Sequence, residues 1–495
     1  MDLKDEERLA VEFLARYRDR GEYLRANVEQ LVRMATCGDE SQEARATGAI
    51  FGSLVEGLCD SFDPESVGLY IRVMAQIIQY CRTLGDQLDW ELADFGLATE
   101  QDLIARAERL RPEPGSSAGP GAPDSWLQDP EGIKLVIILS RVTIGADIAI
   151  TSVLVERLKQ RCSRAALVLA GGVKAREIFG GDGRLGFVGL EYGRRATLMG
   201  RFGCWVDLLD TVRDATRGLQ PDEFLVVDPD SRLTQLGLLP VTREQSYVLF
   251  PSREYLAWSG ESLARLASDW SGRVFGLGGS VQLPRVTISP EDANLARDAI
   301  NVLRRGQSRP VVSVNFGVGG NKKKQVGEDF ELAVLDFLLD TGAIVILDRG
   351  AGVGENSRTD SLTARLASKR TSESASSGLA ILEADEAKLR AISKGPPAES
   401  DLLIFNGRVG LLAGLIAASD LYIGYDSAGQ HIAAGVGTPC IDVFGGYSSP
   451  RMLERWRPTG RGKSIVIDAG SGRSIAEITE EVKAFSRLQV GTFER

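Results

Sequence analysis

The chain has 495 residues, of which 43% are hydrophobic and 25% are charged, and its formal net charge is −10. This length and balance predict two or three globular domains and exclude a disordered or fibrous protein. No apolar run approaches the roughly 18 residues of a spanning helix, and the acidic start "MDLKDEERLA" differs from a secretory signal, so a cytoplasmic location is expected.

The first part of the chain, up to residue 110, has the apolar spacing of helices. Apolar residues recur at three- and four-residue steps in "ERLAVEFLARYRDRGEYLRANVEQLVRMA" and again in "VGLYIRVMAQIIQYCRTL". Residues 1–125 contain 13 basic against 24 acidic side chains, a net −11, and the chain lacks the concentrated basic face that a nucleic-acid partner needs. We predict an all-α N-terminal domain over residues 1–111.

A stretch rich in proline, glycine and serine follows, "RPEPGSSAGPGAPDS", which predicts a linker over residues 112–130. Short apolar runs then alternate with helical stretches. The predicted strands are "KLVIILS", "AALVLAG", "EFLVVD" and "SYVLFP", and "IAITSVLVERLKQR" is the predicted helix after the first of them. This alternation is typical of a doubly wound parallel sheet, here over residues 131–300.

The same alternation restarts at "RPVVSVNFG" and continues through "GAIVILDRG", "LLIFN", "LYIGYD" and "PCIDVFGG". The fold class predicted for the chain is therefore α/β, with two tandem Rossmann-like domains over residues 131–300 and 301–495. We expect them to face each other across a cleft, with ligands beyond the carboxyl ends of the strands. The polar segment from Gly354 to Gly378 is interpreted as a helix followed by a surface loop.

The only histidine of the chain, His431, stands in "DLYIGYDSAGQHIAAGVGTPCIDVFGG". "LYIGYD" is a predicted strand and "QHIAAGVG" a predicted helix, so residues 426–429 form the turn between them. The N-terminus of such a helix binds phosphate, because unpaired N–H groups and the helix dipole point at the ligand. The alternative at this point is a helix cap at Asp426 or Ser427, with His431 packed under the sheet.

The wider pattern resembles the donor-site signature of the heptosyltransferase-like glycosyltransferases, glycosyltransferase family nine. That signature is approximately D-[ST]-G-x-x-H-x-A-A-x-x-x-P, followed by a strand and F-G. The chain follows this approximate pattern from Asp426 through Pro439 to Gly445, with Ala428 where the family usually has glycine and with four residues, not three, between Ala434 and Pro439. The resemblance covers residues 132 to about 490, leaves the helical segment outside, and implies the two-domain GT-B fold.

In this family the first domain opens with a strand and a turn that ends in Gly-Asp, and the aspartate acts as catalytic base. The chain has Gly145, Ala146 and Asp147 at this place, one residue more than usual between the glycine and the aspartate. By resemblance, Asp147 is the predicted catalytic base, and it keeps its four-residue spacing to Thr151. A helix cap is the alternative interpretation of the same position.

The resemblance places the donor-binding residues in the second domain. A lysine after its first strand neutralises the donor's phosphates in the family, and "GNKKKQ" supplies three, of which Lys323 fits best, Lys324 second and Lys322 third. A solvated basic turn is the alternative for these lysines. Glu355 stands where the family holds a ribose hydroxyl with a carboxylate. The predicted donor-binding set is Lys323, Lys324, Glu355, Asp426, Ser427, Ala428, Gly429, Gln430 and His431.

Arginines of the first domain are the predicted acceptor contacts. Arg232 follows "FLVVDPDS", where the family contacts its acceptor, and Arg194, Arg195 and Arg201 form a basic cluster in "EYGRRATLMGRFG". Such a cluster suits an anionic acceptor, for example a phosphorylated glycolipid. Plain solvation of exposed arginines is the alternative.

The resemblance implies an inverting, metal-independent displacement. The donor would be a nucleotide-diphosphate sugar, most simply one like ADP-heptose, and the acceptor a glycan, glycolipid or protein. Asp147 would remove the acceptor proton, while Lys323 and the amides of residues 427–430 hold the diphosphate. Six cysteines without a CxxC pair, and one histidine, offer no zinc-type ligand set, so neither a metal nor another cofactor is expected.

Two other functions stay open on the sequence. One is a non-catalytic GT-B relative that binds a nucleotide sugar or glycan as an interaction protein, and the other is a GT-B sugar-nucleotide epimerase. Residues 1–111 are expected to serve oligomerisation or the binding of a protein partner. The location would be cytoplasmic, with or without peripheral contact to the inner face of the membrane.

Overall fold

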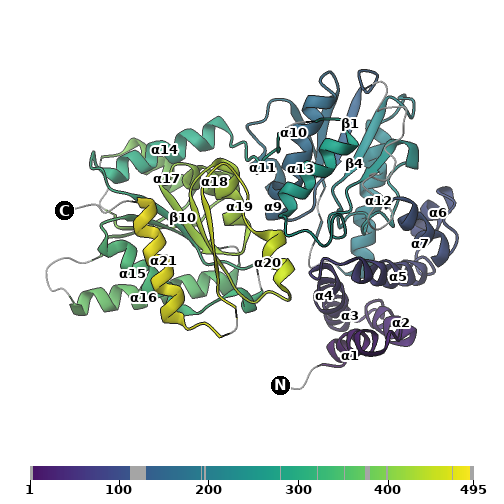
Figure 1. The fold of residues 1–495 in the computed structure, drawn as a ribbon, viewed down its shortest axis with the longest axis horizontal. Helices are drawn as coiled ribbons and strands as arrows, with labels where there is room; N and C mark the ends of the chain where they lie inside the picture. The colour runs from purple at the N-terminus through teal and green to yellow at the C-terminus, as the bar shows by residue number, and fades with distance from the viewer. Residues whose placement is uncertain are drawn as a thin grey trace.

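The structure is a computed structural model that describes residues 4–111, 130–190, 192–193, 197–278, 280–319, 321–350, 352–373, 379–396, 400–470 and 472–490. We call residues 4–111 the helical unit, residues 130–278 the first unit and residues 290–490 the second unit (Figure 1). Apart from residue 130, the predicted linker lies outside the described residues.

The helical unit consists of helices joined by short turns, as the sequence predicts. Polar residues define several of its helix starts: Asp63 caps one helix before a proline, and Thr99 forms a capping box with Asp102. Its elements are α1 (Asp5–Arg20), α2 (Arg25–Met34), α3 (Glu40–Gly48), the π-helix η1 (Ala49–Val55), α4 (Glu56–Cys59), α5 (Pro64–Cys81), α6 (Asp86–Asp94) and α7 (Glu100–Arg109).

The first unit contains a five-stranded parallel sheet with the order β3-β2-β1-β4-β5. Its strands are β1 (Leu135–Leu139), β2 (Ala166–Gly171), β3 (Leu185–Gly189), β4 (Phe224–Asp228) and β5 (Tyr247–Leu249). Its helices are α9 (Ile144–Ala146), the π-helix η2 (Asp147–Thr151), α10 (Ser152–Arg161), α11 (Val173–Ile178), α12 (Leu198–Ala215), the 3-10 helix η3 (Glu244–Ser246) and α13 (Leu263–Val274). The four predicted strands are confirmed, and β3 is additional.

The second unit contains a seven-stranded parallel sheet with the order β12-β11-β10-β6-β7-β9-β8. Its strands are β6 (Val311–Asn315), β7 (Ile344–Asp348), β8 (Ile381–Ala384), β9 (Leu402–Phe405), β10 (Leu421–Tyr425), β11 (Cys440–Phe444) and β12 (Ser464–Asp468). Its helices are α14 (Pro290–Arg304), η4 (Lys322–Lys324), α15 (Glu328–Asp340), α16 (Val353–Glu373), α17 (Glu386–Lys394), α18 (Val409–Ala417), α19 (Ala428–Val436), α20 (Pro450–Trp456) and α21 (Ile475–Val490).

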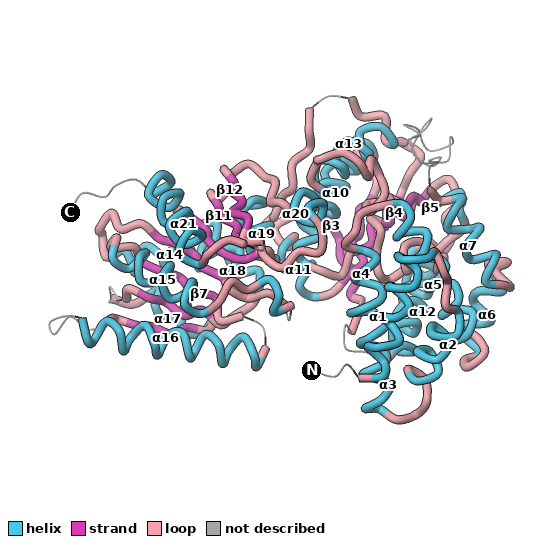
Figure 2. Tube along the Cα trace, turned by 60° about the horizontal axis from the view of Figure 1, so that its bottom comes forward, coloured by secondary structure: helices cyan, strands magenta, loops and turns pink. Residues whose placement is uncertain are grey.

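Helices cover both faces of each sheet, and Figure 2 shows the strands as two separate groups surrounded by helices. In the first sheet, alternate side chains enter two different cores. Val136 and Ile138 pack in the core that holds α10 and α13, while Ile137 and Leu139 pack in the core that holds α12 and the helical unit. The helical unit is therefore part of the covering layer of the first sheet. No helix within the described ranges is both long and apolar enough to cross a membrane.

The predicted single helix after β1 is divided into α9, η2 and α10. The π-helical turn starts at Asp147, directly after the residue that the sequence comparison identified as additional. A π-turn takes up one more residue than an α-turn without breaking the helix. The structure thus absorbs the extra residue locally, and the helix that follows keeps its direction.

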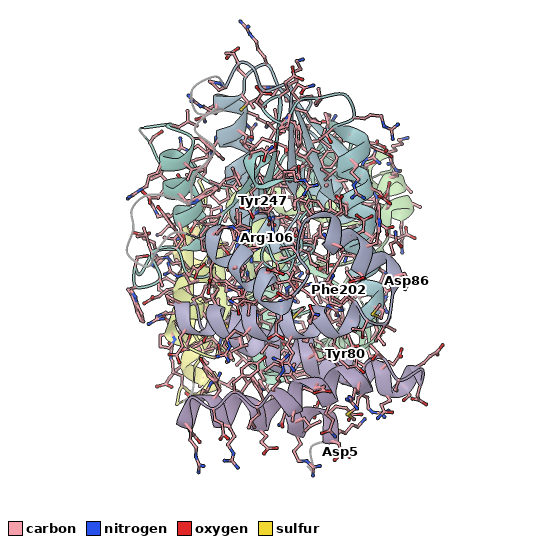
Figure 3. All side chains as sticks on the ribbon, turned by 90° about the vertical axis from the view of Figure 1, so that its right-hand side faces the viewer. Asp5, Tyr80, Asp86, Arg106, Phe202 and Tyr247 are labelled. Carbon is pink, nitrogen blue, oxygen red and sulfur yellow. The ribbon has the colours of Figure 1, made fainter. Side chains whose placement is uncertain are left out.

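Arg106 of α7 connects the helical unit to the first sheet. Its buried guanidinium donates to Gly237 O at 3.2 Å and to Glu244 at 3.1 Å, and its Cζ lies 5.4 Å from the centre of the Tyr247 ring (Figure 3). Arg109, one turn further on, also donates to Glu244, at 2.8 Å, but its side chain is 56% exposed. The two arginines share a partner and differ in burial.

We expect Arg106→Ala to lower the free energy of unfolding of this part by about 3 kcal/mol, because it leaves the buried Gly237 carbonyl without its donor and removes a buried side chain that packs on the Tyr247 ring. Arg109→Ala is the matched control and should cost less than about 1 kcal/mol. Urea titration followed by tryptophan fluorescence measures both. Equal losses in the two variants would show that Arg106 does not connect the units.

Candidate functional site

The strand order reverses once in each sheet, and such a reversal opens a crevice at the carboxyl ends of the strands. In the second sheet it lies between β6 and β10, and in the first between β1 and β4. The two reversal points meet, because Gly145 after β1 lies against His431 of α19: a Cβ on Gly145 would be 2.8 Å from His431 Cδ2. The sequence-predicted catalytic and donor residues therefore gather around one junction.

Lys324 and Asp426 form an ion pair at the reversal point of the second sheet. Lys324 Nζ also lies 3.3 Å from the Asp426 carbonyl oxygen, and Gln430 Nε2 donates to the second carboxylate oxygen of Asp426 at 2.6 Å. The Lys323 side chain is exposed. Of the predicted lysines, the structure therefore brings Lys324, and not the better-fitting Lys323, to the end of β10.

The N-terminus of α19 directly follows the short turn after β10. Its cap residue, Ser427, makes no side-chain cap hydrogen bond, so its side chain does not occupy the first amides of the helix. Gly429 is needed on steric grounds, since a Cβ there would lie 2.0 Å from the Tyr422 hydroxyl. Ala428 is the first helical residue and has no positive φ, so alanine in place of the family's glycine causes no backbone strain.

Asp442 of β11 is a site residue that sequence reasoning missed. It is fully buried, and within the described residues neither carboxylate oxygen has a hydrogen-bond partner. Burial raises the pKa of Asp442 well above its usual range, and the nearby Asp426 carboxylate acts in the same direction while Lys324 opposes it. The sequence does contain a signal for this residue, because an aspartate interrupts the otherwise apolar strand "CIDVF".

His431 is buried between the two units. Its ring packs edge-on against Trp456 of α20, with 5.9 Å between centroids, and it faces Gly145. Burial lowers the pKa of His431 to about 3, with a further contribution from the Lys324 charge. The imidazole is therefore neutral at pH 7 and packs at the junction.

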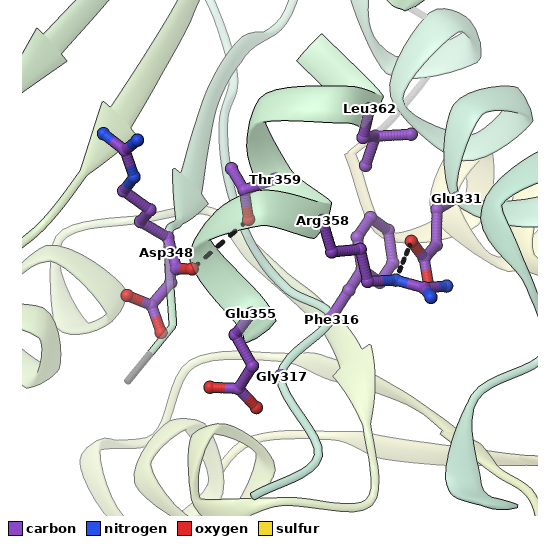
Figure 4. Close-up of a pocket in the computed structure, with 9 residues that line it drawn as sticks. Phe316, Gly317, Glu331, Asp348, Glu355, Arg358, Thr359 and Leu362 are labelled. Carbon is purple, nitrogen blue, oxygen red and sulfur yellow. Dashed lines mark hydrogen bonds and ion pairs between the residues drawn. The ribbon is translucent and has the colours of Figure 1, made fainter. Parts of the chain in front are cut away.

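Glu355 of α16 lies at the loop after β6. Its Oε1 accepts hydrogen bonds from the Val318 and Gly319 amides at 3.0 and 3.1 Å. It lines a small pocket together with Asp348, whose pKa burial raises to about 6 (Figure 4). Asn315 Nδ2 donates to Asp348 at 2.6 Å. Glu355 therefore orients the loop that leads to Lys324; its binding of a ribose hydroxyl stays a prediction.

Asp147 lies in the turn after β1 and is 2% exposed. Its carboxylate accepts hydrogen bonds from Ser140 Oγ at 2.6 Å, the Arg141 amide at 2.7 Å and Thr151 Oγ1 at 2.8 Å. Burial raises the pKa of Asp147, and these three bonds act against that shift. The carboxylate thus organises its own turn, and its role as catalytic base stays a prediction.

The predicted acceptor residues have different surroundings. Arg232 follows β4 and lies 3.7 Å from Glu56 of the helical unit. Arg194 and Arg195 lie outside the described residues. Arg201 is buried, with its guanidinium carbon 3.9 Å from the centre of the Phe51 ring, and its contact with an acceptor stays a prediction. The helical unit therefore reaches the acceptor-side loop, which the sequence did not indicate.

Comparison with known proteins agrees with the predicted resemblance. Residues 382–475 match the model of glycosyltransferase family 9 (heptosyltransferase), a range that includes β10, α19 and β11. No curated protein matches the chain in sequence. The resemblance to heptosyltransferase-like glycosyltransferases is thereby confirmed, on the part of the chain that carries the Lys324 partner Asp426.

Solved structures of glycosyltransferases resemble the chain, and the first named here shares its fold. A glycosyl transferase family 9 structure from Veillonella parvula DSM 2008 has 13% identity, covers 73% of this chain and 98% of its own, and has a TM-score of 0.50. E. coli ADP-heptose lps heptosyltransferase II has 15% identity, coverage of 71% and 98%, and a TM-score of 0.44. E. coli heptosyltransferase WaaC with ADP has 11% identity, coverage of 72% and 99%, and a TM-score of 0.45.

The lone histidine provides a direct test of this site. We expect the His431 ring to stay neutral from pH 8 down to pH 5, since its folded-state pKa is far below the value of 6.5 for an unperturbed imidazole. The NMR spectrum of protein labelled at histidine shows the signals of this single ring. Because the unfolded chain takes up this proton below about pH 6.5 and the folded chain does not, His431 lowers stability as the pH falls from there toward 3. A ring that titrates near 6.5 contradicts the buried placement.

Proposed function

We propose that this chain is a glycosyltransferase of the GT-B type, with the first unit on the acceptor side and the second unit on the donor side. In this proposal the domains are residues 1–111, 131–300 and 301–495, with the linker over 112–130. The observation that supports it most is the Lys324–Asp426 pair beside the uncapped start of α19, at the reversal point of the sheet that matches the family model.

The proposed donor is a nucleotide-diphosphate sugar, most simply one like ADP-heptose. Its phosphates would lie against Lys324 Nζ and the first amides of α19, where a cation, free N–H groups and a helix dipole coincide. Asp426 holds Lys324 in place, and Gln430 orients Asp426. These groups supply the positive charge that the departing diphosphate needs, so the proposal includes neither a metal nor another cofactor.

The proposed reaction is a direct, inverting displacement. An acceptor hydroxyl oxygen forms a bond to the anomeric carbon, and the bond from that carbon to the phosphate oxygen breaks, so that the electron pair leaves with the nucleoside diphosphate. The acceptor would be a glycan, glycolipid or protein, in the cytoplasm or at the inner face of the membrane. A carboxylate must take the hydroxyl proton.

One observation favours the non-catalytic alternative. Asp147, the predicted base, already accepts three hydrogen bonds and is almost completely buried. If no other carboxylate acts, the chain would bind a nucleotide sugar without turning it over. A hydrolysis screen over nucleotide-diphosphate sugars, with binding measured in parallel, separates the two functions: release of nucleoside diphosphate supports the transferase, and binding alone supports the alternative.

The donor lysine is tested by two neighbouring substitutions. We expect Lys324→Ala to weaken ADP binding by about 10- to 100-fold, since it removes a charge-assisted contact worth about 1.5–3 kcal/mol. Lys323→Ala, with an exposed side chain next to it, should change affinity by less than about twofold. Isothermal titration calorimetry measures both, and a thermal melt checks folding. A larger loss in Lys323→Ala would restore the assignment that the sequence favoured.

A further inference from the structure

A second pocket lies between the first unit and the connection from α13 to α14. Its volume is about 530 Å³, within the range of about 300–1,000 Å³ that is usual for small-molecule sites. It is lined by residues of α10 and α13, which Figure 1 shows next to each other, and by residues 276–278 and 280–281. None of its described lining residues belongs to the site around Lys324 and Asp426. The pocket is therefore a separate feature of the molecule.

The side chains that line this pocket carry an excess of positive charge. Three of them are arginines, Arg157, Arg265 and Arg273, while Asp269 is the one carboxylate among the described lining residues. Asp269 already has two partners, because it lies 3.0 Å from Arg273 Nε and accepts a hydrogen bond from the Tyr255 hydroxyl at 2.6 Å. Three positive charges therefore stand against one negative charge that is already paired.

Arg157 of α10 is the buried member of this group, with only 5% of its surface exposed. Its Nη2 donates to the Ser280 carbonyl at 2.9 Å and to Ser268 Oγ at 3.3 Å. Within the described part of the chain its Nε has no hydrogen-bond partner, and no carboxylate opposes the lowering of its pKa by burial. Buried charges in proteins are normally paired, because an unpaired charge loses its hydration without compensation. Arg157 thus lacks a counter-charge.

An anion in the pocket would supply this counter-charge. A guanidinium group binds phosphate oxygens through two parallel hydrogen bonds, and a phosphate monoester carries nearly two negative charges at pH 7. Arg265 and Arg273 are about half-exposed at the rim, where they can contact the same group. We propose that this pocket binds a phosphorylated small molecule, such as a sugar phosphate, with its phosphate group against Arg157, Arg265 and Arg273.

The pocket lies at the start of the segment that joins the first unit to the second. Ser280, which accepts the hydrogen bond from Arg157, belongs to this segment. Six residues further on, the Val286 amide donates to the Gly435 carbonyl of α19 at 3.3 Å. A ligand that holds Arg157 also holds the start of this connection, and it stabilises the folded chain if it binds only that state. The proposal does not depend on the proposed function.

The test uses the full chain and three probes, which are glucose 6-phosphate, inorganic phosphate and glucose. Calorimetry should show binding of glucose 6-phosphate, weaker binding of inorganic phosphate and no binding of glucose. Arg157→Gln keeps an amide donor for the Ser280 carbonyl but removes the charge, and it should weaken the binding of glucose 6-phosphate by at least about 10-fold. Lys324→Ala should leave this binding unchanged, since Lys324 does not line the pocket.

Two further variants keep the test valid if Arg157→Gln fails to fold, which a thermal melt would show. Arg265→Ala removes an arginine of the rim and should weaken the binding of glucose 6-phosphate by about two- to fivefold. Arg164→Ala is the matched control, because this arginine of the same unit is 80% exposed and is not among the described lining residues. Its substitution should leave the affinity unchanged.

The opposite results would overturn the assignment. Absence of binding, or equal affinity for glucose 6-phosphate in the intact chain and in the folded Arg157 and Arg265 variants, would show that the pocket is not an anion site. Equal affinity for inorganic phosphate and glucose 6-phosphate would contradict a phosphorylated small molecule. Loss of binding in Lys324→Ala, with none in Arg157→Gln, would place the probe at the end of β10. The proposed function is tested separately, by the binding of ADP.

Discussion

The ion pair between Lys324 and Asp426 is the interaction on which the site depends. It joins the loop after β6 to the turn after β10, and these loops meet only because the strand order of the second sheet reverses between them. The Lys324 charge also acts on ionisable groups other than Asp426. It lowers the pKa of His431, and it opposes the rise that burial causes in the pKa of Asp442 and of Asp60 in the helical unit.

The helical unit is integrated with the rest of the protein. Its apolar residues belong to the same core as one face of the first sheet, and buried Arg106 donates to a carbonyl of the loop after β4. The same unit extends residues 60–62 to α20 on the other side of the junction. The helical unit therefore contacts both of the other units, through Arg232 of the first and through α20 of the second.

Much of the fold could be predicted from the sequence, because buried parallel strands appear as apolar runs such as "KLVIILS" and "LYIGYD". Strand β3 was missed because "LGFVG" contains two glycines and little β-branched character, and β8 and β12 because edge strands carry polar residues. The predicted helix after Gly354 is confirmed as part of α16, whereas the end of the loop after it lies outside the described residues.

The donor turn could be predicted because strand, turn and helix are contiguous there, so that residues 426–431 are positioned by local structure alone. The choice among three consecutive lysines could not be made, since it depends on which one turns toward Asp426, a residue 102 positions later. Spacing identified Asp147, but a π-turn and three local donors determine where its carboxylate points. The role of Asp442 depends on tertiary contacts, and its only sequence signal was a charged residue inside an otherwise apolar strand.

The most direct test of the account is a crystal structure of the full chain with ADP bound. The account predicts diphosphate oxygens about 3 Å from Lys324 Nζ and from the first amides of α19. A nucleotide bound away from the ends of β6 and β10, with the Lys324–Asp426 pair undisturbed and not in contact with it, would contradict the central claim.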